Sequence, residues 1–445
     1  MKNITIKLLN ILRYFKLNKE VTNSLLTSIP LWIASFIVGG AAVLYAKVFA
    51  WAEAAGIGLF AARPLLLFFV TPACFVISWM IVHKYAPFAR GSGIPQVSAA
   101  LELPTTDQEK ISRLMGLRVI VVKIISTIIL IFGGGAIGRE GPTIQIAGSI
   151  FRTVGKYLPN RLPKNSEQLM ILTGSAAGLA AAFNTPLGGI VFAIEELSKS
   201  HFTSFRATLI TSVIIAGITA QMILGPYLYL GYPVVSANAA LTLTWLVLLV
   251  AVSAGACGAV FSMLVLWIIG MRKRMKTSWV QMASVAGMGM LIAFFGYFAS
   301  PAVLGSGKDS MIALLFASEK VPDVLLAPAR FLGPLLSFSC GAAGGVFAPA
   351  LSSGAAIGAT IAHYFPQSPE QTNILILAGM VSFLTAVTRS PFTSSILVLE
   401  MTDRHAIIFF LMFAGLMSYG AAWLIDTRSL YDRLKEMYLE EVNAA

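Results

Sequence analysis

The amino-acid sequence predicts an all-α polytopic membrane protein in which several helices are broken. Of the 445 residues, 57% are hydrophobic and only 12% are charged, and the mean hydropathy is +0.80. A soluble globular protein has about 25% charged residues. Glycine and proline interrupt several long apolar stretches, and the second half of the chain repeats the motif order of the first. We therefore expect a duplicated membrane domain in which some helices do not cross in one piece.

Ten apolar stretches are long enough to cross a bilayer, which takes about 20 apolar residues. They begin near Leu25, Pro64, Val119, Leu169, Ala207, Leu241, Trp279, Val324, Thr372 and Ala406. Several of them contain interior glycine or proline, so we expect that some do not cross in one piece.

The net charge of +12 comes from basic clusters between the apolar stretches. In a membrane protein the positive-inside rule accounts for such clusters, so nucleic-acid binding is not expected. We interpret the clusters as cytoplasmic, and the first is a candidate amphipathic segment on the membrane surface. They are Lys2–Lys19, Lys110–Arg118, Arg152–Lys164 and Arg272–Lys276.

Cysteine and histidine give no sign of a metal site. The spacings fit neither a disulfide framework nor a zinc or H-E-x-x-H pattern. The residues concerned are Cys74, Cys257, Cys340, His83, His201, His363 and His405. The N-terminus lacks a signal-peptide pattern, because Met1–Lys19 is too charged to supply an apolar region.

The segment Gly91-Ser92-Gly93-Ile94-Pro95 predicts a tight turn that leads into a helix. Two glycines permit the turn, and Pro95 suits the first turn of a helix. The Ser92 hydroxyl and the first N–H groups of that helix would then face the same point. Taken alone, the segment also fits a plain loop in which the serine caps the helix.

The segment Gly138-Arg139-Glu140-Gly141-Pro142 ends an apolar run, Val119 to Ile137, that is long enough to span the bilayer. A charge at that depth costs roughly 2.5–3.5 kcal/mol on insertion scales, so it usually has a partner or a function. Glycine and proline break the helix and free backbone N–H groups. We interpret this segment as an ion site with a gate. Lys123 is a further cation in the same run.

The second half of the chain resembles the first. Residues 172–195 align without gaps with residues 377–400, at a constant offset of 205 residues. Repeats with broken helices in matching places are usual in secondary transporters, with the site between the halves. We predict a basic cytoplasmic N-terminal segment at 1–24, membrane repeats at 25–235 and 236–431, and a short cytoplasmic tail at 432–445. Sequence alone does not show whether the repeats are inverted.

The two copies differ at the charged pair Arg139-Glu140. The second copy reads Gly345-Val346-Phe347-Ala348-Pro349, so it keeps the helix breakers while Val346 and Phe347 replace Arg139 and Glu140. The scaffold therefore does not require the Glu140 carboxylate, which points to a function in the first copy only.

Three turns flanked by glycine and proline, Gly91–Pro95, Gly138–Pro142 and Gly344–Pro349, are expected to aim helix N-termini at the membrane interior. Each N-terminus carries about half a positive charge and unpaired N–H donors, which suits a monovalent anion. No cage of inward carboxylates is visible, so an anion is favoured over a cation-coupled symport. An ionised Glu140 could occupy the anion's place and close the path. A protonated Glu140 would leave and open it.

These three motifs resemble, in identity, order and spacing, the signature motifs of the CLC family of chloride channels and chloride/proton antiporters. The resemblance covers nearly the whole chain, from about residue 25 to Tyr431. It implies a homodimer in which each subunit has its own pore, built from two inverted repeats of broken and tilted helices. Fluoride-selective relatives depart from the first motif, so its intact form here favours chloride.

Carried over motif by motif, the resemblance implies a central chloride site. Ser92 and Tyr431 would each donate a hydroxyl to the ion. The backbone N–H groups of Val346 and Phe347 would complete the site, and those around Arg139–Gly141 would bind an outer anion. Chloride is thus the expected bound substrate, with no metal and no cofactor.

The resemblance also implies two proton-carrying acids. Glu140 resembles the external gating glutamate, and Glu196 resembles the internal glutamate that passes protons from the cytoplasm in the antiporters. Taken alone, Glu195-Glu196 would only mark the place where a helix reaches water, but family channels usually lack the second acid. The sequence therefore favours exchange of chloride for protons, with a passive gated chloride channel as the alternative. After the first motif, this chain has Gln96-Val97-Ser98 where family antiporters often carry carboxylates.

Other classes fit less well. A serine enzyme would need a base beside Ser92, and His83 lies across a basic loop without an orienting acid, so no enzyme is expected. Only 14 residues follow Tyr431, which leaves no room for the paired nucleotide-binding modules of many family members, so no nucleotide is expected. The expected partners are chloride, protons and the lipid bilayer. The expected location is the inner (plasma) membrane, multi-pass, with both termini cytoplasmic.

Overall fold

The computed structural model describes residues 19–157, 165–198, 207–225, 227–236, 241–317, 320 and 322–444. Within these residues all regular structure is helical, apart from two isolated β-bridges. Eight of the described helices are long and apolar enough to cross a membrane. The prediction of an all-α membrane protein is confirmed. Residues 1–18 of the predicted N-terminal segment, and His201, lie outside the described residues.

The first half of the chain forms helices up to α10, including short 3₁₀ helices (η1, η2) and a π-helical turn (η3). In order they are α2 (Lys19–Ala62), η1 (Pro64–Leu66), α3 (Leu67–Tyr85), η2 (Pro87–Ala89), α4 (Ile94–Glu102), α5 (Gln108–Met115), α6 (Leu117–Phe132), α7 (Glu140–Tyr157), α8 (Glu167–Phe183), α9 (Pro186–Phe192), η3 (Ala193–Leu197) and α10 (Ala207–Leu224).

The second half forms the remaining helices. In order they are α11 (Leu241–Lys273), α12 (Ser278–Phe298), η5 (Pro301–Val303), α13 (Lys308–Phe316), α14 (Leu326–Ser339), α15 (Phe347–Tyr364), α16 (Pro369–Thr388), α17 (Pro391–Thr402), η6 (His405–Ile407), α18 (Ile408–Ile425) and α19 (Leu430–Ala444). Of the predicted domain boundaries, the first falls inside α2, the second within the segment 227–236, and the third inside α19.

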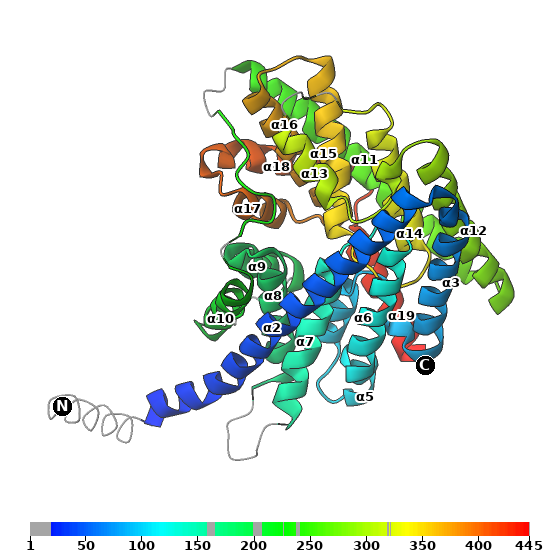
Figure 1. Ribbon diagram of the computed structural model, residues 1–445. Coiled ribbons are helices and arrows are strands. Elements are labelled where there is room, and N and C mark those ends of the chain that lie inside the picture. Colours follow the sequence, from blue (N-terminus) through cyan, green and yellow to red (C-terminus); the bar gives the residue numbers. More distant parts are fainter. Residues whose placement is uncertain are drawn as a thin grey trace.

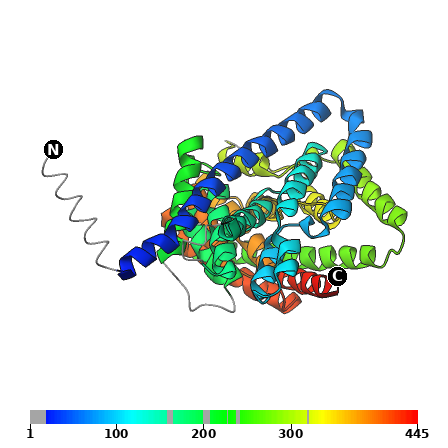
Figure 2. The same cartoon turned by 90° about the horizontal axis from the view of Figure 1, so that it is seen from below.

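The two halves form neighbouring groups of helices (Figure 1). Helices α7–α10 lie together below, α11 and α15–α18 lie together above, and α9 packs against α17 where the groups meet. The long α2 crosses the first group and packs against α6, α7, α8 and α10. Seen from below, α2 crosses one side of the molecule and α19 lies along the opposite edge (Figure 2). Among the described helices α16 is the most enclosed, because every residue from Thr372 to Thr388 is buried.

Two of the ten predicted stretches do not make spanning helices. The stretch near Leu169 forms α8, of 17 residues, and the stretch near Val324 forms α14, of 14 residues. Both fall short of the roughly 20 residues that a span needs. Asn184, in the left-handed conformation with φ of 58°, ends α8, and α14 ends before the turn at Gly341. A hydropathy profile does not reveal these helix ends, because the residues beyond them are also apolar.

The predicted basic loop Arg152–Lys164 also needs correction, because α7 continues to Tyr157. Arg152 is buried in this helix and forms an ion pair with Glu167 at the start of α8. Its Nη2 also donates to Ser112 Oγ at 2.8 Å. A buried charge is stable only when paired and hydrogen-bonded, so Arg152 ties α7 to α5 and α8. Residues 158–164 lie outside the described part of the chain.

The repeat predicted from the sequence is visible in the helix ends. Asn184 ends α8 and Arg389 ends α16, both in the left-handed conformation, with φ of 58° and 63°. Residues other than glycine seldom adopt it. In both copies the next helix begins two residues later with a proline, Pro186 or Pro391, which suits a first helical turn. The copies therefore share backbone geometry as well as sequence.

Two glutamates connect the halves through matching contacts. Glu400 accepts the backbone N–H groups of residues 187 and 188, at the start of α9, at 3.1 and 2.6 Å. Glu195 accepts those of residues 392 and 393, at the start of α17, also at 3.1 and 2.6 Å. Each half thus supplies a glutamate to the other half and receives the equivalent glutamate from it. Reciprocal contacts of this kind belong to an approximate two-fold axis, as an inverted repeat requires.

Replacing either glutamate by alanine is expected to destabilise the fold. Glu195→Ala and Glu400→Ala each remove an ionised acceptor, and a hydrogen bond to a charged group contributes about 1.5–3 kcal/mol. The measurement is the midpoint of thermal unfolding in detergent. Glu109→Ala is the control, because the Glu109 side chain is 81% exposed and exposed helix pairs contribute only about 0.3–0.5 kcal/mol. A loss at only one of the two glutamates would contradict the two-fold description.

Candidate ion-transport site

Three glycine-rich turns meet between the two halves, and the turn before α15 pairs with both of the others. On one side the Gly91 N–H donates to the Ala342 oxygen at 2.8 Å, and the Gly344 N–H donates to the Gly91 oxygen at 3.1 Å. On the other side Gly138 and Gly345 exchange two backbone hydrogen bonds, both 2.8 Å long. The starts of α4, α7 and α15 are thereby brought together, as expected from the three motifs.

Close approach of the chain explains the glycines in these turns. A Cβ at Gly141 would overlap the Ser92 hydroxyl, and one at Gly345 would lie 3.0 Å from the Gly138 carbonyl oxygen. Gly93 has φ of 107°, which residues with side chains rarely adopt. Ser92 therefore lies directly against the turn that carries Glu140. It does not cap α4, whose N-cap is Gly93 without any side-chain hydrogen bond.

Helix α6 supports the junction. Lys123 is fully buried, and its Nζ donates to the Gly91 carbonyl oxygen at 3.0 Å. Nearly one helical turn further on, Ser126 Oγ accepts the Ala343 N–H at 3.1 Å. The intramembrane lysine noted in the sequence thus holds the backbone of the first turn, one residue before Ser92.

The residues predicted to bind chloride lie next to one another. Ser92 Oγ and the Tyr431 hydroxyl oxygen are 3.4 Å apart, and both side chains are buried. The Tyr431 ring stacks on Phe347, with centroids 6.3 Å apart and an interplanar angle of 14°. Phe347 begins α15, and Val346 is its N-cap. Because the first N–H groups of a helix have no acceptor within it, two hydroxyls and a helix start gather at one place.

Glu140 is the first residue of α7 and is only 1% exposed. Its Oε1 accepts a hydrogen bond from the Tyr229 hydroxyl at 3.1 Å, and Arg139 Nε lies 4.0 Å from the same oxygen. Its Oε2 has no hydrogen-bond partner among the described residues. A Cβ at Gly138 would overlap this oxygen, so the glycine makes room for the carboxylate. Sequence reasoning missed Tyr229, which belongs to no motif and lies outside the aligned segments 172–195 and 377–400.

Glu196 lies in the π-helical turn η3 and is 4% exposed. Such turns occur frequently at functional sites. Ser390, the N-cap of α17, donates its hydroxyl to Glu196 Oε2 at 2.7 Å. The equivalent pair in the other copy is Met401 and Thr185, so the acid is absent there, and Thr185 Oγ1 lacks a partner among the described residues. The fold therefore does not require an acid at this place.

A small cavity of about 20 Å³ lies between Glu196 and Tyr431. This is room for about one water molecule. Glu102 and Lys435 also line it, as an ion pair with a separation of 2.6 Å in which the Glu102 side chain is 39% exposed. Glu102 lies one helical turn after Ser98 and supplies an acid near Glu196 that the sequence lacked at residues 96–98. Sequence reasoning missed Glu102, although its spacing of four residues was a usable signal.

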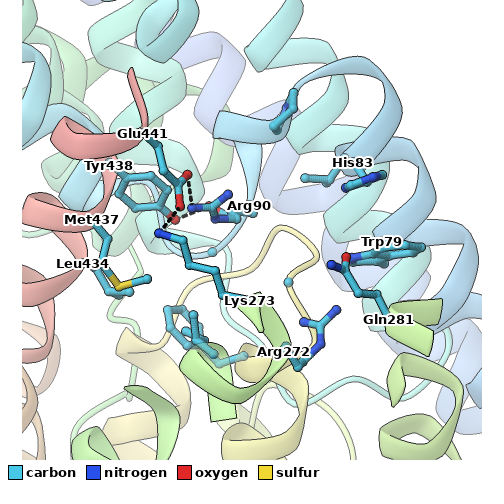
Figure 3. A pocket seen from close by; sticks show the side chains of 16 residues that line it. Trp79, His83, Arg90, Arg272, Lys273, Gln281, Leu434, Met437, Tyr438 and Glu441 are labelled. Carbon is cyan, nitrogen blue, oxygen red and sulfur yellow. Dashed lines mark hydrogen bonds and ion pairs between the residues drawn. The ribbon is translucent and has the colours of Figure 1, made fainter. Parts of the chain in front are cut away.

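A larger cavity of about 250 Å³ opens beside Gly91 (Figure 3). Arg90, Arg272 and Lys273 line it, so the predicted basic cluster at 272–276 begins here. Glu441 lies between two of these cations, 2.5 Å from Arg90 and 3.4 Å from Lys273. A cavity lined by positive charge raises the local concentration of anions, and this one reaches the turn that carries Ser92.

The three cysteines and His83 pack against their neighbours as ordinary side chains of the fold. Cys74 and Cys340 are buried and Cys257 is half-buried, all as free thiols. His83 stacks on Trp79, with ring centroids 4.9 Å apart. In the described part of the chain, no three His, Cys, Asp or Glu side chains are grouped so that they could hold a metal ion.

Broken helices that start at one buried point, together with the eight candidate membrane spans among the described residues, define a multi-pass membrane transport protein. The chain belongs to the voltage gated chloride channel family, whose family model matches residues 74–422. It is accordingly a CLC family transport protein and not an enzyme.

Solved structures of transporters have the same fold. A slow cyanobacterial Cl⁻/H⁺ antiporter matches with a TM-score of 0.80 and 24% identity, over 94% of this chain and 99% of that chain. A CLC-type fluoride/proton antiporter matches with a TM-score of 0.76 and 19% identity, over 92% and 97%. A eukaryotic CLC transporter matches with a TM-score of 0.74 and 20% identity, over 93% and 75%.

Proposed function

We propose that this protein exchanges chloride for protons, with Glu140 as the external gate and Glu196 as the internal proton acceptor. One observation carries the proposal: a buried pair of hydroxyls lies between two buried acids. Ser92 lies against the turn of Glu140, and Tyr431 shares a cavity with Glu196. An anion held by the two hydroxyls would therefore have a proton carrier on either side.

Chloride is proposed to bind between the Ser92 and Tyr431 hydroxyls, with the backbone N–H groups of Val346 and Phe347 completing the site. The N–H groups of Arg139–Gly141 would bind an outer ion. Helix starts supply N–H donors and partial positive charge, which favour anions. The intact first motif supports chloride over fluoride. The proposed site uses only groups of the chain itself, so we propose no cofactor and no nucleotide.

The gate follows from the position of Glu140. Ionised and buried at the start of α7, its carboxylate stands where the N–H donors of that helix would bind an anion, and it closes the path. Protonation removes the charge that favours this place, so the side chain leaves and chloride enters. The proton then moves inward while chloride moves outward, or the reverse.

On the inner side, Glu196 is proposed to receive protons through the cavity that Glu102 and Lys435 line. Room for about one water molecule between Glu196 and Tyr431 supports a short proton path. The hydroxyl of Ser390 holds the carboxylate in place. The absence of an equivalent acid from the second copy supports a role in transport and not in the scaffold.

We propose that the protein lies in the plasma membrane with both termini cytoplasmic, as repeats 25–235 and 236–431 of a homodimer with a pore in each subunit. The basic clusters support this orientation, and the cavity of Figure 3 would then admit cytoplasmic chloride. Leu187 and Phe392, at matching positions of α9 and α17, expose apolar side chains (53% and 45%) where a second subunit could pack.

The deciding experiment reconstitutes the purified protein into liposomes and imposes a chloride gradient without a proton gradient. Uphill proton movement, cancelled by a protonophore, is the expected result. Chloride flow without proton movement would instead identify a passive channel. Replacing chloride by fluoride in the same vesicles tests the ion, and we expect fluoride to drive little proton movement.

Glu196→Gln is expected to abolish proton pumping while chloride still crosses. The amide keeps the size of the side chain and its acceptor for Ser390 but cannot carry a proton. Proton and chloride fluxes are measured in the same vesicles, with Glu436→Gln as control, because Glu436 is about half exposed on α19 and pairs with the exposed Arg428. Proton pumping that persists in Glu196→Gln would remove Glu196 from the proton path.

A further inference from the structure

Tyr229 lies on the segment 227–236, which connects the two halves of the molecule. Hydrogen bonds to its backbone fix this segment on both sides. Asn184 Nδ2 donates to the Tyr227 carbonyl oxygen at 2.7 Å, and the Leu230 N–H donates to the Met401 carbonyl oxygen at 3.1 Å. One anchor lies in each repeat, so the position of Tyr229 depends on both.

The Tyr229 side chain is equally constrained, and it is 3% exposed. Its ring packs edge-on against Phe183, with centroids 5.0 Å apart, and Lys308 Nζ lies 4.5 Å from the ring centroid. With the ring fixed, the hydroxyl is directed at Glu140 Oε1, 3.1 Å away. A phenol held in this way meets the carboxylate without further loss of side-chain freedom.

The hydrogen bond favours one protonation state of Glu140. Hydrogen bonds to an ionised acceptor are roughly twice as strong as those between neutral groups. The Tyr229 hydroxyl therefore stabilises the charged carboxylate in its buried place more than it stabilises the neutral acid. The geometry points to Tyr229 as a positioning residue that holds the ionised Glu140 side chain in the closed place and thereby sets the pH at which the path opens. This inference rests on the proposed role of Glu140 as the gate.

Other charged and titratable groups also face Glu140. They are Arg139 beside it, Lys308 from α13, Tyr45 from α2, Tyr431 from α19, and Tyr227 on the segment of Tyr229. The two cations favour the ionised acid as well. All of these groups remain when only the Tyr229 hydroxyl is removed, so that substitution isolates its contribution.

Tyr229→Phe keeps the ring and its packing but removes the donor. The ionised carboxylate is then less stable, so Glu140 takes up a proton at lower proton concentration. In reconstituted vesicles, the pH of half-maximal chloride turnover is expected to rise by about one unit, a tenfold change in proton concentration. Site-specific 3-fluorotyrosine at position 229, whose phenol is a stronger donor, is expected to shift the profile to lower pH.

Controls separate this inference from the gate assignment. Tyr227→Phe changes a tyrosine on the same segment and should shift the profile much less, because the hydroxyl that donates to Glu140 is that of Tyr229. In a Glu140→Gln background, Tyr229→Phe should have no effect on the pH profile. If both Tyr229 variants match the wild-type profile while Glu140→Gln loses proton coupling, the gate stands and Tyr229 does not control it. The inference also fails if Tyr227→Phe shifts the profile as much, or if Glu140→Gln still pumps protons, in which case the gate assignment fails with it.

Discussion

Glu140→Gln is expected to abolish chloride-driven proton pumping and to leave a pathway that conducts chloride at all pH values. This is the largest functional effect we expect from a single substitution. Glutamine has the shape of a protonated glutamate, so it no longer competes with the anion through charge and cannot carry a proton. The measurement is proton and chloride flux in vesicles across a range of pH, where proton flux should fall to the leak of empty vesicles.

The comparison with Glu196→Gln sharpens this test. Both variants should lose proton movement, but only Glu140→Gln should also lose the pH dependence of chloride flux, because only Glu140 is proposed to occupy the anion's place. Chloride flux that stays strongly pH-dependent in Glu140→Gln would mean that another group forms the gate.

Gly354→Ala is expected to have the largest effect on folding. Gly354 of α15 and Gly379 of α16 lie so close that a Cβ on either would overlap the carbonyl oxygen of the other. Such close contacts between small residues are how membrane helices pack. A backbone carbonyl cannot move aside as a flexible side chain can, so the two helices must separate. We expect a cost of about 3 kcal/mol or more, at or above the usual range for overpacking.

The measurement is the fraction of monodisperse protein after extraction and its unfolding midpoint. Gly287→Ala on α12 is the matched control, because no atom lies within 4 Å of a Cβ built there. In a helix interior that change should be neutral or slightly stabilising. Equal behaviour of Gly354→Ala and Gly287→Ala would show that α15 and α16 are not packed as closely as described.

Much of the fold could be predicted because hydropathy and helix breakers act locally. In the described part of the chain, eight candidate spanning helices and the helix starts at Ile94, Glu140 and Phe347 follow from apolar runs and glycine–proline turns. The short α8 and α14 could not be predicted in this way. Their ends depend on single residues, such as Asn184 in a left-handed conformation, within sequence that stays apolar on both sides.

The reciprocal contacts of Glu195 and Glu400 could not be predicted from the sequence either. Taken alone, Glu195-Glu196 fitted a helix end in water, yet one acid binds the start of α17 and the other is buried against Ser390. Adjacent residues take different roles here because the π-helical turn directs their side chains to different partners. The offset of 205 residues related Glu195 to Glu400 by sequence, but it did not show that each contacts the other's half.

At the site, the motifs predicted which residues would gather but not what surrounds them. Ser92 and Tyr431 are 339 residues apart in the chain and lie together. Tyr229 could not be found, because a single tyrosine in an irregular segment has no periodicity, and its contact with Glu140 exists only once both repeats are folded. Lys123 was visible as a buried cation, but only the structure gives its partner, the Gly91 carbonyl oxygen.

The paired hydrogen bonds between Gly138 and Gly345 have a consequence for the motions of transport. They fix the main chain two residues before Glu140, while Gly344 ties the same strip of backbone to Gly91. Because these hydrogen bonds hold the backbone on both sides, the torsions of the Glu140 side chain are what can still change. Side-chain rotations of this kind are far faster than the rocking of whole domains. Gating would then require only rotation of the Glu140 side chain, while the surrounding backbone stays in place.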